Sequence, residues 1–137
     1  MFQKILVAMA LDHGVSQHTL QIANKLKNGD GEILALHVIE EPHGSANVRL
    51  REDMLTTGEE RERDLFQEKL ADHPDVHLML ARGHVSRTIL DVAREEGADC
   101  IVMGSHKPGF ADFLLGSNAA RVVRNATCSV YVYRAAE

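Results

Sequence analysis

The chain has few aromatic side chains and no block of positive charge. Aromatic residues make up 4% of its 137 residues, Trp is absent, no run of Lys or Arg exceeds two residues, and the formal net charge is −5. A surface that binds nucleic acid needs clustered basic side chains, and it often adds aromatic side chains on which bases stack. The composition therefore excludes nucleic acid as an expected partner.

Long apolar segments are absent as well. No apolar run approaches the length of a membrane span, and the N-terminal residues enter a strand pattern without the charged and apolar regions of a signal peptide. We therefore expect no membrane partner and a cytoplasmic location. The two cysteines, Cys100 and Cys128, lie beside strand-like residues. We expect two buried thiols in a reducing compartment rather than a disulfide.

Two common nucleotide-binding signatures are missing. Gly-x4-Gly-Lys-Ser/Thr does not occur, and Gly-x-Gly-x-x-Gly does not follow the first strand pattern. The histidines also give no metal-binding pattern: His73 and His77 are four residues apart, but Pro74 lies between them and the segment enters a strand. We therefore predict no metal site made by side chains of the protein.

The sequence does contain a regular alternation of strand and helix patterns. Strands are expected at residues 5–8, 33–39, 76–80, 100–103 and 129–133. Helices are expected from a cap at Ser16 to a stop at Asn28 and Gly29, over residues 50–71, from a cap at Ser86 to Gly97, and from about Ser117. The inward residues should include Met54, Leu65 and Phe66 in the second helix, and Ala120 and Val123 in the last. Parallel strands joined by helical crossovers form a doubly wound sheet. We therefore predict one α/β domain over residues 1–137, with a five-stranded parallel sheet of order 3-2-1-4-5 and helices on both faces.

Such sheets bind ligands at the carboxyl ends of the strands beside the switch point, here between the first and fourth strands. The loop after the fourth strand carries Gly104 and Gly116, which let the backbone approach a ligand closely. It ends at a helix start, where the N–H groups of Ser117 and Asn118 have no helical partners and can hold phosphate. Arg121 is a further cation one turn away. The pattern alone leaves open that Ser117 only caps the helix and that the glycines only turn the chain.

Several motifs over essentially the whole chain resemble those of the universal stress protein family. They are Ile5-Leu6-Val7, His37-Val38-Ile39-Glu40, Gly83, the run from Ala98 to Ser105, Leu115-Gly116-Ser117 and the run from Cys128 to Val132. Residues 114–120 are similar to the small single-domain F and G branches of that family. The resemblance implies an adenine nucleotide alpha hydrolase-like fold and a stress-response module that binds ATP, with a divalent cation such as Mg²⁺ at the phosphates.

The resemblance also implies roles for individual residues. Nucleotide-binding members carry Gly-x2-Gly-x9-Gly-Ser/Thr after the fourth strand. Gly104, Gly116 and Ser117 correspond to its first glycine and its last pair, and Asn118 would add a backbone N–H to the phosphates. Val38 would offer main-chain groups to adenine. Met103 would line the base or the ribose.

Two departures from the family pattern bear on the site. Lys107 stands at the middle glycine and could place a cation near phosphate; Gly109 comes two residues later, and the loop is one residue shorter. Where the family usually has an acidic residue after the first strand, this chain has Ala10, and Asp12 is the nearest substitute. The ribose would lie near Ala10 and Asp12, and Ala8 is a further candidate for nucleotide binding. These departures favour one alternative, a nucleotide-free stress protein that acts through dimer and partner surfaces.

The loop supplies no convincing base for an attacking water, so we expect no catalytic residues and at most slow hydrolysis. A weak ATP hydrolase is the remaining alternative, and it would need His106 or Asp112 at the γ-phosphate. The last strand, from Val130 to Tyr133, lies at the edge of the proposed sheet, and an exposed apolar edge tends to pair. The resemblance implies that this strand pairs with its own copy across a two-fold axis, which gives a homodimer.

Overall fold

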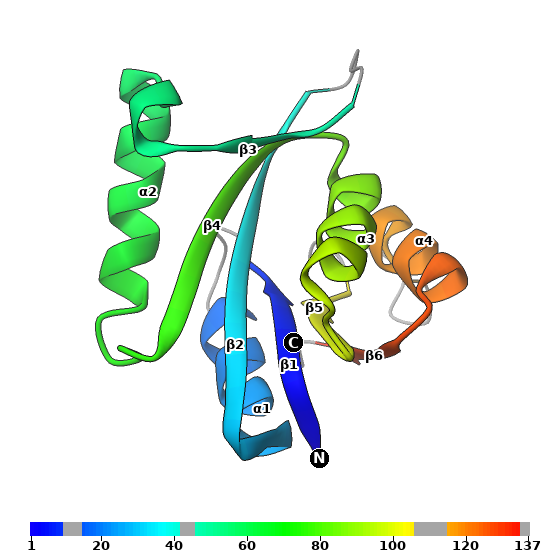
Figure 1. Cartoon of the computed structure of the whole chain (residues 1–137). Coiled ribbons are helices and arrows are strands. Elements are labelled where there is room, and N and C mark those ends of the chain that lie inside the picture. Colours follow the sequence, from blue (N-terminus) through cyan, green and yellow to red (C-terminus); the bar gives the residue numbers. More distant parts are fainter. Residues whose placement is uncertain (10–14, 42–45, 106–114, 135–137) are drawn as a thin grey trace.

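The computed structural model describes residues 1–9, 15–41, 46–105 and 115–134. Figure 1 shows a twisted sheet with α3 and α4 together on one side and α2 on the other. The elements in chain order are β1 (Phe2–Ala8), α1 (Val15–Leu26), β2 (Lys27–Glu40), β3 (Val48–Leu50), the 3₁₀ helix η1 (Glu52–Met54), α2 (Thr57–Lys69), β4 (Val76–Gly83), α3 (Val85–Glu96), β5 (Cys100–Gly104), α4 (Ser117–Asn125) and β6 (Ser129–Tyr133).

The strand order of the sheet is β3-β4-β2-β1-β5-β6. The five strands that the sequence predicts are parallel and lie in the predicted order, so the doubly wound fold is confirmed. The predicted count of five is wrong, because β3 adds a sixth strand that runs antiparallel to β4, with Val48 opposite Arg82. A strand of three residues next to a helical pattern is too short to give a period-two signal.

The sheet is buried on both faces. Ile5 and Val7 of β1 face the layer of α1 and α2, in one core cluster with Leu20 and Phe66. Leu6 lies in the second cluster, below α3 and α4. Alternate side chains of a strand point to opposite faces. A central strand covered by helices on both faces therefore reads as a continuous apolar run.

The connection from α1 to β2 differs from the prediction. α1 begins at Val15, one residue before the predicted cap, and ends at Leu26, and β2 begins at the next residue. Asn28 therefore lies in a strand rather than at a helix stop, and its side-chain amide donates to Gln3 Oε1 at 3.2 Å. Pairing with β1 at Phe2 and Lys27 takes this segment into the sheet.

The predicted helix over residues 50–71 is also shorter in the structure, where α2 covers only Thr57–Lys69. A capping box sets its start: the Thr56 hydroxyl accepts from Glu59 N–H at 3.1 Å, and the Glu59 carboxylate accepts from Thr56 N–H at 3.0 Å. Phe66 is fully buried as predicted, whereas Leu65, predicted to face inward, is 48% exposed.

The ends and faces of the last two helices bring further corrections. His84, not Ser86, is the N-cap of α3, and Ser86 is buried in its first turn. α3 ends as predicted, at Gly97 in the left-handed conformation with φ of 71°. In α4 the buried residues are Ala119 and Val122. The prediction of Ala120 and Val123 is therefore wrong by one residue, and Val123 is 47% exposed. A shift of one residue turns a helix face by about 100°.

Candidate functional site

The carboxyl ends of β1, β2 and β5 meet at the middle of the sheet. β1 pairs with β2 on one side and with β5 on the other, so the strand order reverses at β1. The Met9 N–H donates to the Leu36 carbonyl at 2.8 Å, which continues the pairing just past the end of β1. This edge is the switch point at which doubly wound sheets bind their ligands.

Three predicted site residues share one face at this edge. Met103 belongs to the core cluster under α3 and α4, and Ala8 and Val38 are partly buried against the same cluster. They follow Leu6, Leu36 and Ile101 by two positions in their strands, so the alternation of side chains places all three on one side. Together they form an apolar floor at the carboxyl ends of three adjacent strands, in which Ala8 and Val38 are half-buried and Met103 is buried.

The two ends of the loop between β5 and α4 are held together. Gly104 is the last residue of β5. The Ser105 N–H donates to the Tyr133 carbonyl at 2.9 Å, and the Gly116 N–H donates to the Ser105 carbonyl at 3.1 Å. The loop therefore leaves and rejoins the fold at one place, beside the end of β6. Four predicted site residues lie outside the described residues: Ala10, Asp12, Lys107 and Gly109. The same holds for His106 and Asp112.

Within the described residues, the N-terminus of α4 has no side-chain cap. Its N-cap, Gly116, has no side chain to accept from the first amides, and the first helical hydrogen bond runs from Ala120 N–H to the Gly116 carbonyl at 2.9 Å. The N–H groups of Ser117, Asn118 and Ala119 therefore have no helical partners. The first turn carries no acidic side chain. Free amides at the positive end of a helix dipole attract an anion.

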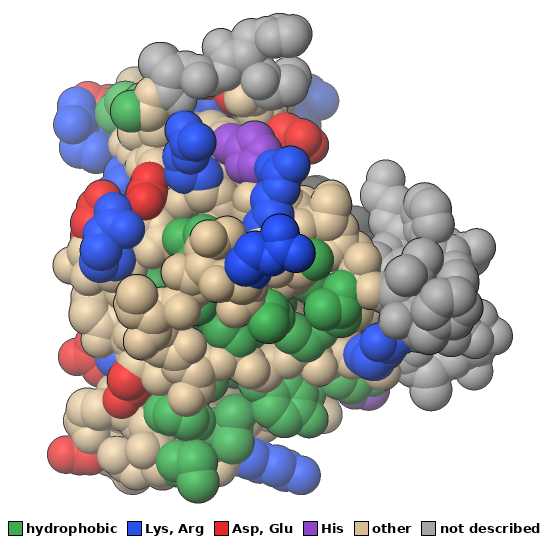
Figure 2. Space-filling model, turned by 90° about the vertical axis from the view of Figure 1, so that its right-hand side faces the viewer, with side chains coloured by type: hydrophobic (Ala, Val, Ile, Leu, Met, Phe, Trp, Pro, Cys, Tyr) green, Lys and Arg blue, Asp and Glu red, His purple; other side chains and the backbone are tan. Residues whose placement is uncertain are grey.

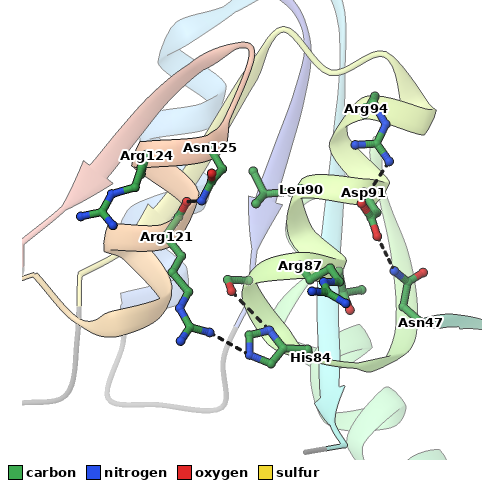
Figure 3. A pocket seen from close by; sticks show the side chains of 11 residues that line it. Asn47, His84, Arg87, Leu90, Asp91, Arg94, Arg121, Arg124 and Asn125 are labelled. Atoms are coloured by element: carbon green, nitrogen blue, oxygen red, sulfur yellow. Dashed lines mark hydrogen bonds and ion pairs between the residues drawn. The ribbon is translucent and has the colours of Figure 1, made fainter. Parts of the chain in front are cut away.

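A contact between α3 and α4 lies close to this helix start. Arg121 Nη1 is 3.0 Å from His84 Nε2, and His84 Nδ1 is 3.3 Å from the Ser86 hydroxyl (Figure 3). A guanidinium can only donate, so His84 Nε2 is the acceptor of this pair. His84 is not among the site residues that the sequence predicts. His84 and Arg121 are 37 positions apart in the sequence, so no local sequence pattern predicts their contact.

Neither cysteine is a reactive group. Both are free, Cys100 is buried and Cys128 is half-buried. Burial raises the pKa of the Cys100 thiol to about 11 and also raises the pKa of the Cys128 thiol. Both thiols are therefore protonated at neutral pH. A cysteine that acts as a nucleophile or as a metal ligand must instead be a thiolate.

Within the four described ranges, no helix combines the length and the apolar character that a membrane crossing requires.

The chain matches known proteins over nearly its full length. The model of the universal stress protein family matches residues 1–134. Universal stress protein G of Shigella flexneri is 32% identical over 130 residues, which cover 88% of this chain and 89% of that protein. Universal stress protein A homolog 2 of Coxiella burnetii is 30% identical over 140 residues, which cover 97% of this chain and 95% of that protein.

Solved structures share the fold. UspA of Lactobacillus plantarum superposes with a TM-score of 0.75 at 21% identity and covers 96% of this chain and 97% of its own. A universal stress protein in complex with cAMP has a TM-score of 0.68 at 19% identity, covering 96% and 97%. The protein from Archaeoglobus fulgidus in complex with dAMP has a TM-score of 0.60 at 18% identity, covering 95% and 96%. The family match and the two sequence relatives show that this chain belongs to the universal stress protein family.

Proposed function

We propose that this chain is a stress-response regulatory module that binds ATP at the carboxyl ends of β1, β2 and β5. The observation that carries the proposal is the open N-terminus of α4 beside an apolar floor, since a nucleotide needs both a place for its ring and donors for its phosphates. Two proteins of the same fold that were solved with cAMP and dAMP support an adenine nucleotide as the ligand class.

The proposed pose follows the geometry of this edge. The base lies near the main chain of Val38, with the ribose toward Ala8 and the side chain of Met103 below them. The phosphates lie over Gly116, where the amides of Ser117 and Asn118 donate to their oxygens. Bound nucleoside triphosphates usually carry a divalent cation, and we expect Mg²⁺ to accompany the phosphates here.

We further propose that the module hydrolyses ATP slowly or not at all. Hydrolysis requires a group that takes a proton from the attacking water. The described polar residues at the two ends of the loop are Ser105, Ser117 and Asn118, and none of them is a carboxylate or an imidazole. The imidazole of His84, between α3 and α4, is engaged with Arg121. Function would then depend on whether the nucleotide is bound, through the surface that the protein presents to its partners.

Thermal unfolding with and without ATP tests the proposal. A ligand at a hundredfold excess over its Kd stabilises the folded state by about 2.7 kcal/mol, so ATP should raise the Tm of the wild type. Gly116→Val should weaken the shift, because it places a branched side chain where the phosphates would lie. Gly29→Val is the matched control: a Cβ at Gly29, which lies in β2, meets no atom within 4 Å, and this variant should keep the shift.

Two outcomes decide between this proposal and the nucleotide-free alternative. Equal Tm values for the wild type with and without excess ATP would overturn nucleotide binding. Mass spectrometry of the denatured purified protein gives a second readout, since a co-purified adenine nucleotide excludes the nucleotide-free version.

We also propose that the protein is a homodimer that pairs through β6. Among the described residues, β6 ends the strand order and pairs with β5 alone, so no described strand lies at its other edge. Tyr131 on β6 is 43% exposed, and Val123 on α4 is 47% exposed. Figure 2 shows hydrophobic side chains gathered on the face that includes this part of the molecule. Pairing of two copies would cover both the open backbone and the apolar side chains.

We place the protein in the cytoplasm. The free thiols of Cys100 and Cys128 suit a reducing compartment, where such residues stay unpaired.

A further inference from the structure

A groove of about 710 Å³ runs between α3 and α4. Its volume is typical of a small-molecule site. The lining residues are Asn47, His84, Ser86, Arg87, Thr88, Leu90, Asp91, Arg94, Arg121, Arg124 and Asn125. Arg121, one turn from the amides proposed to hold phosphate, belongs to this lining, whereas Gly116, Ser117 and Asn118 do not. The groove therefore adjoins the proposed nucleotide site but has a different lining.

Positive charge dominates the two walls of the groove. Arg87 and Arg94 stand on α3, and Arg121 and Arg124 stand on α4 (Figure 3). Against these four arginines the lining holds a single carboxylate, that of Asp91. The whole chain carries a net charge of −5, so this concentration of arginine is local. Figure 2 shows Lys and Arg side chains gathered over the upper part of this face.

Two of the four guanidinium groups are free to bind a ligand. Arg94 pairs with Asp91 at 3.0 Å, and Arg121 contacts His84 at 3.0 Å. Arg87 and Arg124 are exposed and have no ion pair or hydrogen bond within the part of the chain that the structure describes. Unpaired arginines that line one groove repel one another, and a bound anion would offset this repulsion.

The other acidic side chains of α3 do not neutralise the groove. Glu95 accepts from Arg49 at 2.6 Å, and Glu96 accepts from Arg49 at 2.8 Å. Glu96 also pairs with Lys4 at 3.4 Å. These carboxylates are already paired with cations outside the groove, and neither belongs to its lining.

We propose that this groove is a second binding site, for an oligophosphate: a chain of linked phosphates, either free or as the tail of a nucleotide. The guanidinium group binds phosphate oxygens through two parallel N–H donors. Leu90 is the one apolar side chain of the lining, and no aromatic side chain lies there. A base would find nothing to stack on, so recognition falls on the charged chain.

The spacing of the arginines favours a chain of phosphates over a single one. Arg87 and Arg94 are seven positions apart on α3, which corresponds to about 10 Å along the helix axis. Arg121 and Arg124 are three positions apart on α4 and so are neighbours on its surface. A single phosphate reaches only part of this array, whereas several linked phosphates can contact both walls along its length.

Calorimetric titration with inorganic tripolyphosphate tests the site. We expect binding to the wild type with one site per chain, and weaker binding of orthophosphate. The double variant Arg87→Gln/Arg124→Gln removes the two free guanidinium groups and should weaken tripolyphosphate binding by at least about tenfold. Both side chains are exposed, so we expect the variant to fold, which a thermal melt without ligand checks.

The matched control removes the same charge elsewhere. Arg61 on α2 and Arg51 before η1 are exposed and lie outside the groove. Arg51→Gln/Arg61→Gln should bind tripolyphosphate as the wild type does. Equal weakening in both double variants would overturn the site, because the effect would then come from the overall charge. Absence of binding to the wild type would overturn it as well, and so would tighter binding of a glutamate hexamer, which would assign the groove to an acidic peptide.

Further titrations separate this site from the proposed nucleotide site and identify the source of the phosphates. Gly116→Val should retain tripolyphosphate binding, and loss of binding would show that the ligand uses the α4 N-terminus instead. If the groove takes the tail of a nucleotide, ATP should bind the Gly116→Val variant at one site per chain and AMP should not. If the variant binds tripolyphosphate but does not bind ATP, the groove takes a free oligophosphate rather than the tail of a nucleotide. None of these results depends on ATP binding at the switch point.

Discussion

Arg82 on β4 holds both carboxylate oxygens of Glu59 on α2. Arg82 Nη2 lies 2.7 Å from Oε1 and 2.8 Å from Oε2, and Nε lies 3.2 Å from Oε2. The same carboxylate accepts the Thr56 N–H and so caps the helix. The Glu59 side chain is only 11% exposed. One carboxylate therefore both starts α2 and ties it to the sheet.

Replacing Glu59 should destabilise the protein in a way that depends on pH. The hydrogen bonds from Arg82 lower the pKa of Glu59 below its ordinary value of 4.5, against the effect of burial. A carboxyl with a lowered folded pKa stabilises the fold above its unfolded pKa, and this stabilisation is lost as pH falls through the folded pKa. Wild-type stability should therefore decline below about pH 4.5, partly through this group.

The variant Glu59→Gln isolates the charge, because Gln also serves at this position of a capping box. At pH 7 we expect a loss of about 1–3 kcal/mol in the free energy of unfolding, as for a hydrogen bond to a charged group. The difference between variant and wild type should shrink in acid. Urea denaturation at several pH values measures both quantities. A difference that stays constant from pH 7 to pH 3 would show that the ion pair contributes nothing.

Asp99 is a second carboxylate whose loss should be measurable. Burial alone would raise its pKa, but the N–H groups of Gln3 and Lys4 donate to it at 2.9 and 3.0 Å and hold the pKa below its ordinary value of 3.8. Asp99→Ala leaves these two donors without their acceptor and should cost about 1–2 kcal/mol in the free energy of unfolding. Asp99→Asn keeps one acceptor oxygen and should cost less. Equal losses in the two variants would contradict this account.

The parallel part of the fold could be predicted from the sequence because its strands are continuous apolar runs between clear helices. β3 could not, since Val48 to Leu50 owe their extended form to pairing with β4 rather than to their own pattern. The prediction of the buried face of α4 was wrong by one residue for a similar reason. Contacts with α3 and the sheet bury Ala119 and Val122, and the sequence does not distinguish Val122 from the equally apolar Val123.

The functional residues, too, could be predicted from the sequence only in part. Family motifs predicted residues that the structure brings to one edge of the sheet, among them Val38, Met103 and Gly116. The arginine groove could not be predicted, because it requires that α3 and α4 be neighbours. Arg87 and Arg124 lie 37 positions apart in the sequence, and each reads locally as an ordinary solvated charge on a helix.

Thr88 offers a stabilising substitution. It is fully buried, and its hydroxyl has no hydrogen-bond partner within the described part of the chain. A buried hydroxyl without a partner costs about 1–3 kcal/mol. Thr88→Val keeps the shape and removes the hydroxyl, so the free energy of unfolding should rise by about 1 kcal/mol, measured by urea denaturation. Thr88→Ser keeps the hydroxyl and loses the methyl group, so it should destabilise. A destabilising Thr88→Val would indicate that the hydroxyl is bonded after all.

Dimerisation through β6 predicts that a charge on that strand separates the two copies. Tyr131→Arg places a like charge on each side of the two-fold axis, where an isologous interface brings identical residues close together. We expect the wild type to sediment as a dimer and this variant as a monomer.

The opposite edge of the sheet supplies the control. Val48 on β3 is 41% exposed, close to the 43% of Tyr131, and β3 ends the strand order on the other side. Val48→Arg adds the same charge to an exposed edge residue and should leave the dimer intact. If Val48→Arg dissociates the dimer and Tyr131→Arg does not, the interface lies at β3. The exposed side chains of β6 would then need another partner, because an open apolar edge strand attracts further chains until something covers it.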